Sequence, residues 1–302
     1  MAPDTAIALF VYNRPSHTKQ VLEALANADG AQHVRLFIFS DGAKAGDEKA
    51  VAEIRNLIDV FPWSGTKTIV ERASNYGLAK NITEGVTSVL DRYDQIIVLE
   101  DDIVLSKGAI RYFQDALRLY RDDEKVMHIS AYNWPVKAEL PTTFLFRGLS
   151  CWGWATWRDA WLFYTPDVEV LMDVIQKRGL VDAFNLDGAQ SYFDHLLSNQ
   201  SGELNTWAIR WQASIFIANG LTLMPGKSMV QNIGLDNTGV HSQARHQKRF
   251  SHQELAESVP LHKLAIKENE DAYQALRQFF LSPKQRGRKA RLVDFLRTLI
   301  GK

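Results

Sequence analysis

The chain has 302 residues, of which 46% are hydrophobic and 23% are charged, and its formal net charge is zero. These values are typical of a globular protein with an ample core, and the neutral balance gives no argument for nucleic-acid binding. The single cysteine, Cys151, excludes an internal disulfide framework and a cysteine-built metal site. No apolar run of about 18 residues, the length a membrane span needs, is present, so we expect a cytoplasmic protein.

The first half of the chain alternates short apolar runs with stretches whose apolar residues recur at helical spacing. Because strands and helices alternate in this way in βαβ units, we expect an α/β fold with a mixed, mostly parallel sheet flanked by helices. The expected strands are residues 6–12, 34–39, 66–71, 96–99 and 126–131, and the expected helices between them are residues 18–28, 51–61, 80–92 and 107–120.

The pattern changes after Pro135. We expect a strand at residues 144–146, and then an aromatic segment that begins at Ser150 and has a helix beyond it. The later elements are helical pieces over residues 168–201, a helix at 206–219, a strand at 221–225 and a loop over 228–240 that is rich in glycine and asparagine. The whole is consistent with one large domain that has an elaborated second half.

Three adjacent carboxylates, Glu100, Asp101 and Asp102, directly follow the apolar strand at residues 96–99. Acids are costly inside a buried sheet, so the strand must emerge here, at the edge where ligands of α/β sheets bind. Neighbouring carboxylates at such an edge suit Mg2+ or Mn2+ carrying a diphosphate; a charged turn between strand and helix is the alternative. Polar residues also follow the neighbouring strands, namely Asn13, Arg14, Asp41, Arg72 and Asn75.

The segments Asn13-Arg14-Pro15, Ser40-Asp41 and Glu100-Asp101-Asp102 together resemble the GT-A glycosyltransferases, whose metal-binding D-x-D motif the triplet matches in an E-D-D form. The similarity is greatest to the N-acetylglucosaminyltransferase I-like group and to bacterial surface-polysaccharide sugar transferases, which have similar WGWATW and NIG segments. It covers roughly residues 6–241. The resemblance implies a GT-A, Rossmann-like fold and a hexosyl- or N-acetylhexosaminyltransferase that uses Mn2+ or Mg2+ and a nucleotide-sugar donor, with a UDP-sugar favoured.

Carried over position by position, the resemblance assigns Asp102 and His241 to the metal ion. It implies that Asp101 contacts the ribose or the donor sugar, and that Asp41 reads the uracil N–H. Arg14 would contact the nucleotide. The complete set of expected donor contacts is Tyr12, Asn13, Arg14, Asp41, Asn75, Asn81, Glu100, Asp101 and Ser228.

The acceptor side departs from the family pattern. Inverting relatives place a carboxylate, the general base, next to the tryptophan of the acceptor-side helix, whereas Trp207 is followed here by Ala-Ile-Arg. We expect Glu203 to be the base, with Asp194 as the second candidate; a retaining mechanism or an inactive domain would be the alternatives. Trp152, Trp154 and Trp207 would either stack on sugars or pack in the core.

The resemblance divides the chain into a nucleotide-sugar-binding half, an acceptor-binding half of the same domain and a helical basic tail, which are residues 1–135, 136–250 and 251–302. The last segment, 284–302, carries seven Lys or Arg and one Asp. Such a tail fits an anionic membrane surface, which would place the protein peripherally on the inner face of the plasma membrane with a glycan or lipid-linked acceptor. A helix packed on the domain is the alternative for the tail.

Two other functions are compatible with this reading. A nucleotidyltransferase that makes nucleotide sugars shares the general sheet, but it normally has a glycine-rich basic loop after the first strand, which Asn13-Arg14-Pro15-Ser16 does not supply. A non-catalytic glycan-binding module would explain the absence of an acid after Trp207.

Overall fold

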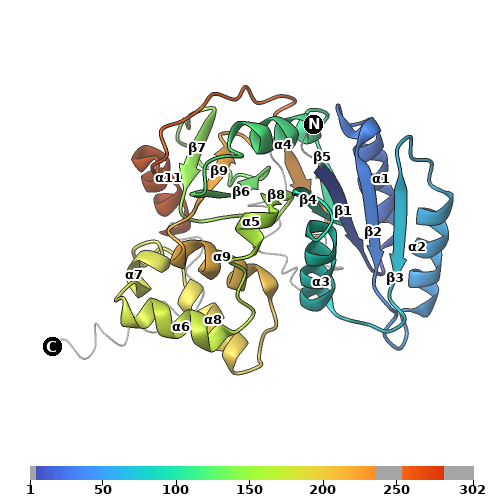
Figure 1. Ribbon diagram of the computed structural model, residues 1–302, viewed down its shortest axis with the longest axis horizontal. Coiled ribbons are helices and arrows are strands. Elements are labelled where there is room, and N and C mark those ends of the chain that lie inside the picture. The colour runs from blue at the N-terminus through green and yellow to red at the C-terminus, as the bar shows by residue number, and fades with distance from the viewer. Residues whose placement is uncertain (1–4, 236–253, 282–302) are drawn as a thin grey trace.

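The computed structural model describes residues 5–235 and 254–281. Within these residues, eight strands form one sheet in the order β3-β2-β1-β4-β8-β6-β9-β7 (Figure 1), and two more form a small antiparallel sheet. The strands are β1 (Thr5–Val11), β2 (Arg35–Ser40), β3 (Lys67–Glu71), β4 (Gln95–Glu100), β5 (Ile103–Leu105), β6 (Val126–Ser130), β7 (Thr143–Phe146), β8 (Trp154–Trp157), β9 (Leu221–Pro225) and β10 (Val230–Asn232).

The helices follow the strands closely in the first half and gather in a separate group in the second half. They are α1 (Pro15–Asn27), α2 (Glu48–Val60), α3 (Leu78–Leu90), α4 (Ala109–Leu119), α5 (Arg158–Trp161), α6 (Val168–Lys177), α7 (Val181–Phe184), α8 (Tyr192–Gln200), α9 (Trp207–Ile217) and α11 (Glu270–Leu281), with a 3-10 turn η1 (Ala31–His33).

The sheet is mixed and mostly parallel, as the sequence predicts. β1 pairs in parallel with β2 and β4, and β2 pairs in parallel with β3. β8 lies antiparallel between β4 and β6, β9 runs parallel to β6, and β7 is antiparallel to β9. Only β7 and β8 therefore oppose the common direction among the described strands of this sheet, and the predicted α/β class is confirmed.

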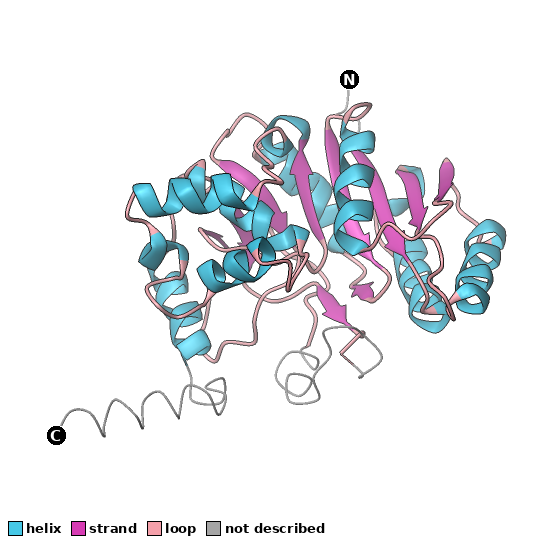
Figure 2. Cartoon of the chain, turned by 90° about the horizontal axis from the view of Figure 1, so that it is seen from below, coloured by secondary structure: helices cyan, strands magenta, loops and turns pink. Residues whose placement is uncertain are grey.

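Helices cover both faces of the sheet (Figure 2). Side chains alternate across a strand, and β1 shows the result. Ile7 and Leu9 pack in the cluster that includes residues of α1, α2 and α4, whereas Ala8 and Phe10 pack in the cluster that includes residues of α3 and α9. Each fully buried Ile, Leu or Phe contributes roughly 1.5–3 kcal/mol, so the strand is fixed from both sides and its carboxyl end has a defined position.

Two features differ from the sequence prediction. The aromatic segment after Ser150 contains a strand, β8, whose four side chains are all buried. Trp154 packs on one face of the sheet and Ala155 on the other, so the segment has the period-two alternation of a central strand. The second feature is the two-stranded antiparallel sheet of β5 and β10, in which Ile103, the residue after the acidic triplet, pairs with Asn232.

The tryptophans of the second half form a buried core rather than a sugar platform. Trp154 is fully buried, Trp207 is 3% exposed, and their rings stack with centroids 5.2 Å apart. Trp152 is half-buried and meets Tyr132 edge-on at 4.5 Å. Core packing is therefore the role of Trp154 and Trp207.

His128 lies in the middle of this aromatic core and must be neutral. The Trp211 indole N–H donates to its Nδ1 at 3.1 Å, so Nε2 carries the hydrogen that points to the Ser150 carbonyl oxygen, also at 3.1 Å. The ring stacks on Trp154. Burial lowers the pKa of His128 to about 3, and a second N–H on Nδ1 would face the indole donor in a fully buried site.

None of the helices in residues 5–235 and 254–281 is long and apolar enough to cross a bilayer.

Candidate functional site

The parallel strands β1, β2 and β4 end side by side, and the chain leaves each of them through polar residues. In the register of the sheet, Val11 is opposite Ser40, and Phe10 is opposite Glu100. The residues that follow, 12–14, 41 and 101–102, therefore meet at one edge. Ligands of open α/β sheets bind at this edge, in the crevice beyond the carboxyl ends of the strands.

The exit of β1 contacts the acids at the exit of β4. The Arg14 guanidinium donates from Nη1 to Asp102 Oδ2 at 2.8 Å, and each of the two side chains is 18% exposed. The Tyr12 backbone N–H donates to Asp101 Oδ2 at 3.1 Å. Two neighbouring carboxylates and one guanidinium are thus held together at the mouth of the crevice.

The pKa values of all three acids of the triplet are raised, although the positive charge of Arg14 lies beside them. Burial, followed by the charge of Asp102, raises the pKa of Asp101 to about 7. Burial and the two neighbouring acids raise the pKa of Glu100 well above its usual range. Burial also raises the pKa of Asp102, and the Arg14 charge opposes this shift. A group of acids with raised pKa values favours an additional cation, because the cation stabilises their ionised form.

The carboxylate oxygens at this edge suit a hard divalent cation that takes its remaining ligands from the phosphates of a substrate. Among residues 5–235 and 254–281, no three His, Cys, Asp or Glu side chains are placed to hold a metal ion by themselves. Mg2+ in particular is usually bound through one or two carboxylates, substrate phosphates and water, and Asp102 would supply such a carboxylate. His241, the other expected ligand, lies outside the described residues.

Asp41 is buried and holds two loops together. Its carboxylate accepts four hydrogen bonds, from the backbone N–H groups of Gly42, Tyr76 and Gly77 and from the Asn75 side chain, at 2.8–3.2 Å. A carboxylate offers about four acceptor positions, and all of them are used within the protein. The expected contact of Asp41 with a uracil N–H would therefore have to replace one of these bonds.

Tyr12 and Asn13, which we expect to contact the nucleotide-sugar donor, both form hydrogen bonds with Asp47. The Tyr12 hydroxyl donates to Asp47 Oδ2 at 2.6 Å, and the Asn13 amide donates to Oδ1 at 3.0 Å. Burial and the bond to Asp47 raise the pKa of Tyr12 to about 12, so that its hydroxyl stays a donor, and the same bond lowers the pKa of Asp47. These hydrogen bonds connect the loop after β2, through Asp47, to the residues that follow β1.

The other expected donor contacts also have partners inside the protein. The Asn75 amide donates to the Gly42 carbonyl oxygen at 2.8 Å as well as to Asp41. Asn81 is 3% exposed and accepts from Arg72 Nε at 3.0 Å. Ser228 has no exposed surface, and its hydroxyl donates to the Val230 carbonyl oxygen at 2.7 Å. The polar atoms named here on these three side chains are therefore used on partners within the protein.

The two candidate bases lie in the second half of the chain, in α8 and in the turn that follows it. Asp194 is exposed in the first turn of α8. Glu203 is exposed in the turn after this helix, where its Oε2 accepts from the Ser198 hydroxyl at 3.1 Å. Asp187, a third acid of this region, accepts from the Tyr273 hydroxyl at 2.5 Å, which ties it to α11.

Three residues that shape the site were not predicted from the sequence. Asp47 has no motif around it, and its role depends on Tyr12 and Asn13, more than thirty residues away. Gly42 approaches the next loop so closely that a Cβ here would lie 2.2 Å from the Ser74 carbonyl carbon. Gly234 approaches Asp102 in the same way. The only sequence signal for these glycines is their place in polar loops.

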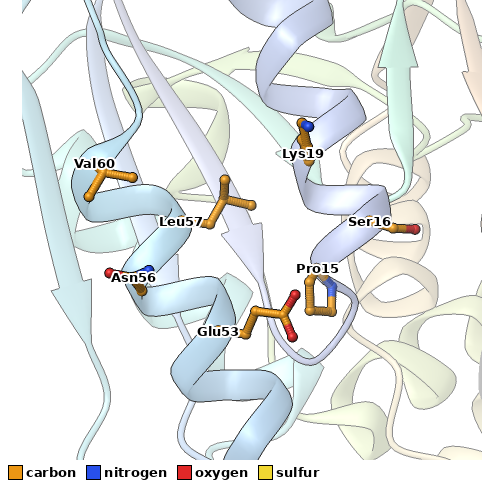
Figure 3. A pocket seen from close by; sticks show the side chains of 7 residues that line it. All are labelled: Pro15, Ser16, Lys19, Glu53, Asn56, Leu57 and Val60. Carbon is orange, nitrogen blue, oxygen red and sulfur yellow. The ribbon is translucent and has the colours of Figure 1, made fainter.

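An open groove of about 400 Å³ lies elsewhere, between α1 and α2 (Figure 3). Residues such as Lys19, Glu53 and Leu57 line it. None of the expected site residues takes part in this groove, so we do not assign the ligand site to it.

No protein-family profile matches this chain, and no curated protein is detectably similar to it. Among solved structures, the chain is similar to a mannosyltransferase, PcManGT from Pyrobaculum calidifontis, in complex with GDP-Man and Mn2+. The TM-score is 0.38 and the identity 10%, over 72% of this chain and 70% of that one. A likeness at this distance assigns neither a ligand nor a residue role to the present chain.

Proposed function

We propose that this chain is a metal-dependent glycosyltransferase of the GT-A type that transfers a sugar from a nucleotide-sugar donor, a UDP-sugar by preference. The observation that carries the proposal is the meeting of Asp101, Asp102 and Arg14 at the carboxyl ends of two neighbouring parallel strands. A diphosphate needs both kinds of group, because carboxylates hold the divalent cation and a guanidinium binds the phosphate oxygens directly.

The donor would sit with its diphosphate at the mouth of β4. A bound Mn2+ or Mg2+ would neutralise charge on the departing nucleoside diphosphate. In this arrangement Asp102 would hold the cation, with His241 as the second expected ligand, while Asp101 and Glu100 would face the ribose and the donor sugar. Arg14 would bind a phosphate oxygen. Asp41 acts through the loop at residues 75–77, which it holds beside the crevice.

The acceptor would approach from the second half of the chain. Its hydroxyl oxygen forms a bond to the anomeric carbon while the bond from that carbon to the phosphate oxygen breaks. The hydroxyl proton passes to a carboxylate, which must come within about 3 Å of the attacking oxygen. We propose Glu203 for this base and Asp194 as the second candidate, since both are exposed acids of the acceptor half.

In this proposal, residues 1–135 bind the donor, residues 136–250 bind the acceptor, and residues 251–302 form the C-terminal segment. The two halves belong to one sheet: β8 of the second half lies between β4 and β6 of the first, which is compatible with two binding regions in a single domain. We propose a glycan or lipid-linked acceptor in bacterial surface-polysaccharide synthesis, at the inner face of the plasma membrane. The basic segment 284–302, which would reach that membrane, lies outside the described residues.

The test is the release of UDP from UDP-sugars in the presence and absence of Mn2+. We expect Mn2+-dependent release that falls about 100-fold or more in Asp102→Asn, since the position of the cation is lost. Asp122→Asn is the matched control, because Asp122 is an exposed acid after α4, and it should behave like the wild type. Release of pyrophosphate from a nucleoside triphosphate and a sugar phosphate would instead indicate a nucleotidyltransferase. Sugar binding without turnover would indicate a binding module.

A further inference from the structure

Asp102 Oδ2 is enclosed by two parts of the chain. On one side is the Arg14 guanidinium, whose Nη1 lies 2.8 Å from Asp102 Oδ2. On the other is the backbone of Gly234, where a Cβ would lie 2.1 Å from Oδ2 and 2.5 Å from Arg14 Nη1. The Ile233 N–H also donates to the Asp102 carbonyl oxygen at 2.9 Å. The turn at residues 233–234 thus lies directly against the Arg14–Asp102 pair.

The turn is built onto the acidic triplet itself. β5 begins one residue after Asp102 and pairs with β10, and Asn232 is opposite Ile103. The buried Asn232 side chain accepts from the Gly234 N–H at 2.8 Å, which fixes the bend after β10. Absence of a side chain at position 234 is what allows this approach, so the enclosure of Asp102 Oδ2 is a built feature of the fold.

The Arg14 side chain has no role in starting α1. Arg14 is the residue before Pro15 at the helix start, and it makes no side-chain capping bond. Its backbone carbonyl oxygen accepts from the Thr18 N–H and hydroxyl, both at 2.9 Å. These backbone bonds survive any substitution of the side chain, so the ion pair with Asp102 is the interaction by which the guanidinium acts here.

We infer that Arg14 is a stand-in cation, and that it and the divalent cation exclude each other at Asp102 Oδ2. This inference rests on the proposed function, because it assumes that Asp102 holds a cation. A metal ion binds a carboxylate oxygen at about 2.1 Å, which would place it next to a guanidinium of the same charge sign in a half-buried site. A metal ion on this oxygen would therefore have to displace Arg14, and the phosphates of the donor would offer the guanidinium a new partner.

The arrangement couples the two ligands. Metal alone must break the Arg14–Asp102 bond without replacing it, whereas metal together with nucleotide moves Arg14 onto phosphate. Each ligand thus raises the affinity of the other, by the same factor. In the donor-free protein Asp102 keeps Arg14 as its partner, which weakens the binding of a cation on its own.

The experiment is a titration with Mn2+ alone, followed by the electron paramagnetic resonance signal of free Mn2+, on the wild type, Arg14→Gln, Arg14→Lys and Asp102→Asn. Without nucleotide, Arg14→Gln should bind Mn2+ about tenfold more tightly than the wild type, as expected when one charge-assisted hydrogen bond no longer has to be broken. Arg14→Lys should stay near the wild type. Addition of UDP should raise the Mn2+ affinity of the wild type more than that of Arg14→Gln.

Equal or weaker Mn2+ binding by Arg14→Gln, with binding still abolished in Asp102→Asn, would overturn this inference and leave the proposed function standing. Absence of Asp102-dependent Mn2+ binding in both the wild type and Arg14→Gln would overturn the inference and the metal-dependent function together. Far-ultraviolet circular dichroism and the unfolding midpoint establish that the variants are folded, and Arg14→Lys separates loss of charge from loss of packing.

Discussion

Replacing Asp41 with asparagine tests how the loop at residues 75–77 is held to the end of β2. One oxygen of the carboxylate accepts from the Gly42 and Tyr76 N–H groups, and the other accepts from the Gly77 N–H and the Asn75 amide. Asparagine can supply only one of these oxygens. Whichever way its amide is turned, an NH2 group faces two donors in a site that is 4% exposed in the native protein.

Two hydrogen bonds to a charged acceptor are lost, at about 1.5 kcal/mol or more each, so we expect Asp41→Asn to lower the free energy of unfolding by about 3 kcal/mol. Urea unfolding followed by tryptophan fluorescence measures this loss. Asp47→Asn is the matched control, because one of its partners is the Tyr12 hydroxyl, which can turn and accept from the new NH2 group. Its loss should be smaller. A free energy of unfolding for Asp41→Asn within about 0.5 kcal/mol of the wild type would refute the reasoning, since lost buried hydrogen bonds cost more than that.

Two further predictions follow from buried groups. Gly42→Ala should lower the free energy of unfolding by about 1–3 kcal/mol, because the added Cβ would lie 2.2 Å from the Ser74 backbone, which cannot move as a side-chain tip could; unchanged urea unfolding would contradict the close approach. His128 has a pKa of about 3 in the folded protein and about 6.5 in the unfolded chain. Its contribution to the free energy of unfolding is therefore complete above pH 6.5 and is lost as the pH falls toward 3, because the unfolded chain binds the proton first. The stability difference between the wild type and His128→Gln should therefore narrow by about 1.4 kcal/mol per pH unit below 6.5; a difference that stays constant from pH 7 to pH 5 would argue against a buried neutral ring.

The parallel part of the fold was predictable because its signals are local. The runs at residues 6–12, 34–39 and 96–99 are apolar except for Arg35, as expected of strands with helices on both faces, and they form β1, β2 and β4. β8 was not predictable in the same way. It has only four residues, Trp-Ala-Thr-Trp, which form neither an unbroken apolar run nor an alternation of polar and apolar residues.

The sequence indicates where the candidate site lies but not which contacts its residues make. Acids after an apolar strand mark the edge of the sheet, and there Asp102 accepts from Arg14 and Asp101 accepts from the Tyr12 backbone N–H. Three of the four partners of Asp41, however, come from a loop 34–36 residues away. Nothing in the local sequence separates a carboxylate that closes a loop from one that reads a ligand, since the difference lies in which donors the fold brings to it.

The most direct test of the central claim is a crystal structure of the protein with UDP and Mn2+, with data collected to locate manganese by its anomalous signal. We expect an anomalous peak about 2.1 Å from an Asp102 carboxylate oxygen, with the UDP diphosphate on the same ion and Arg14 turned from Asp102 to a phosphate oxygen. Bound UDP with no manganese at Asp102, and with the Arg14–Asp102 pair intact, would contradict the account.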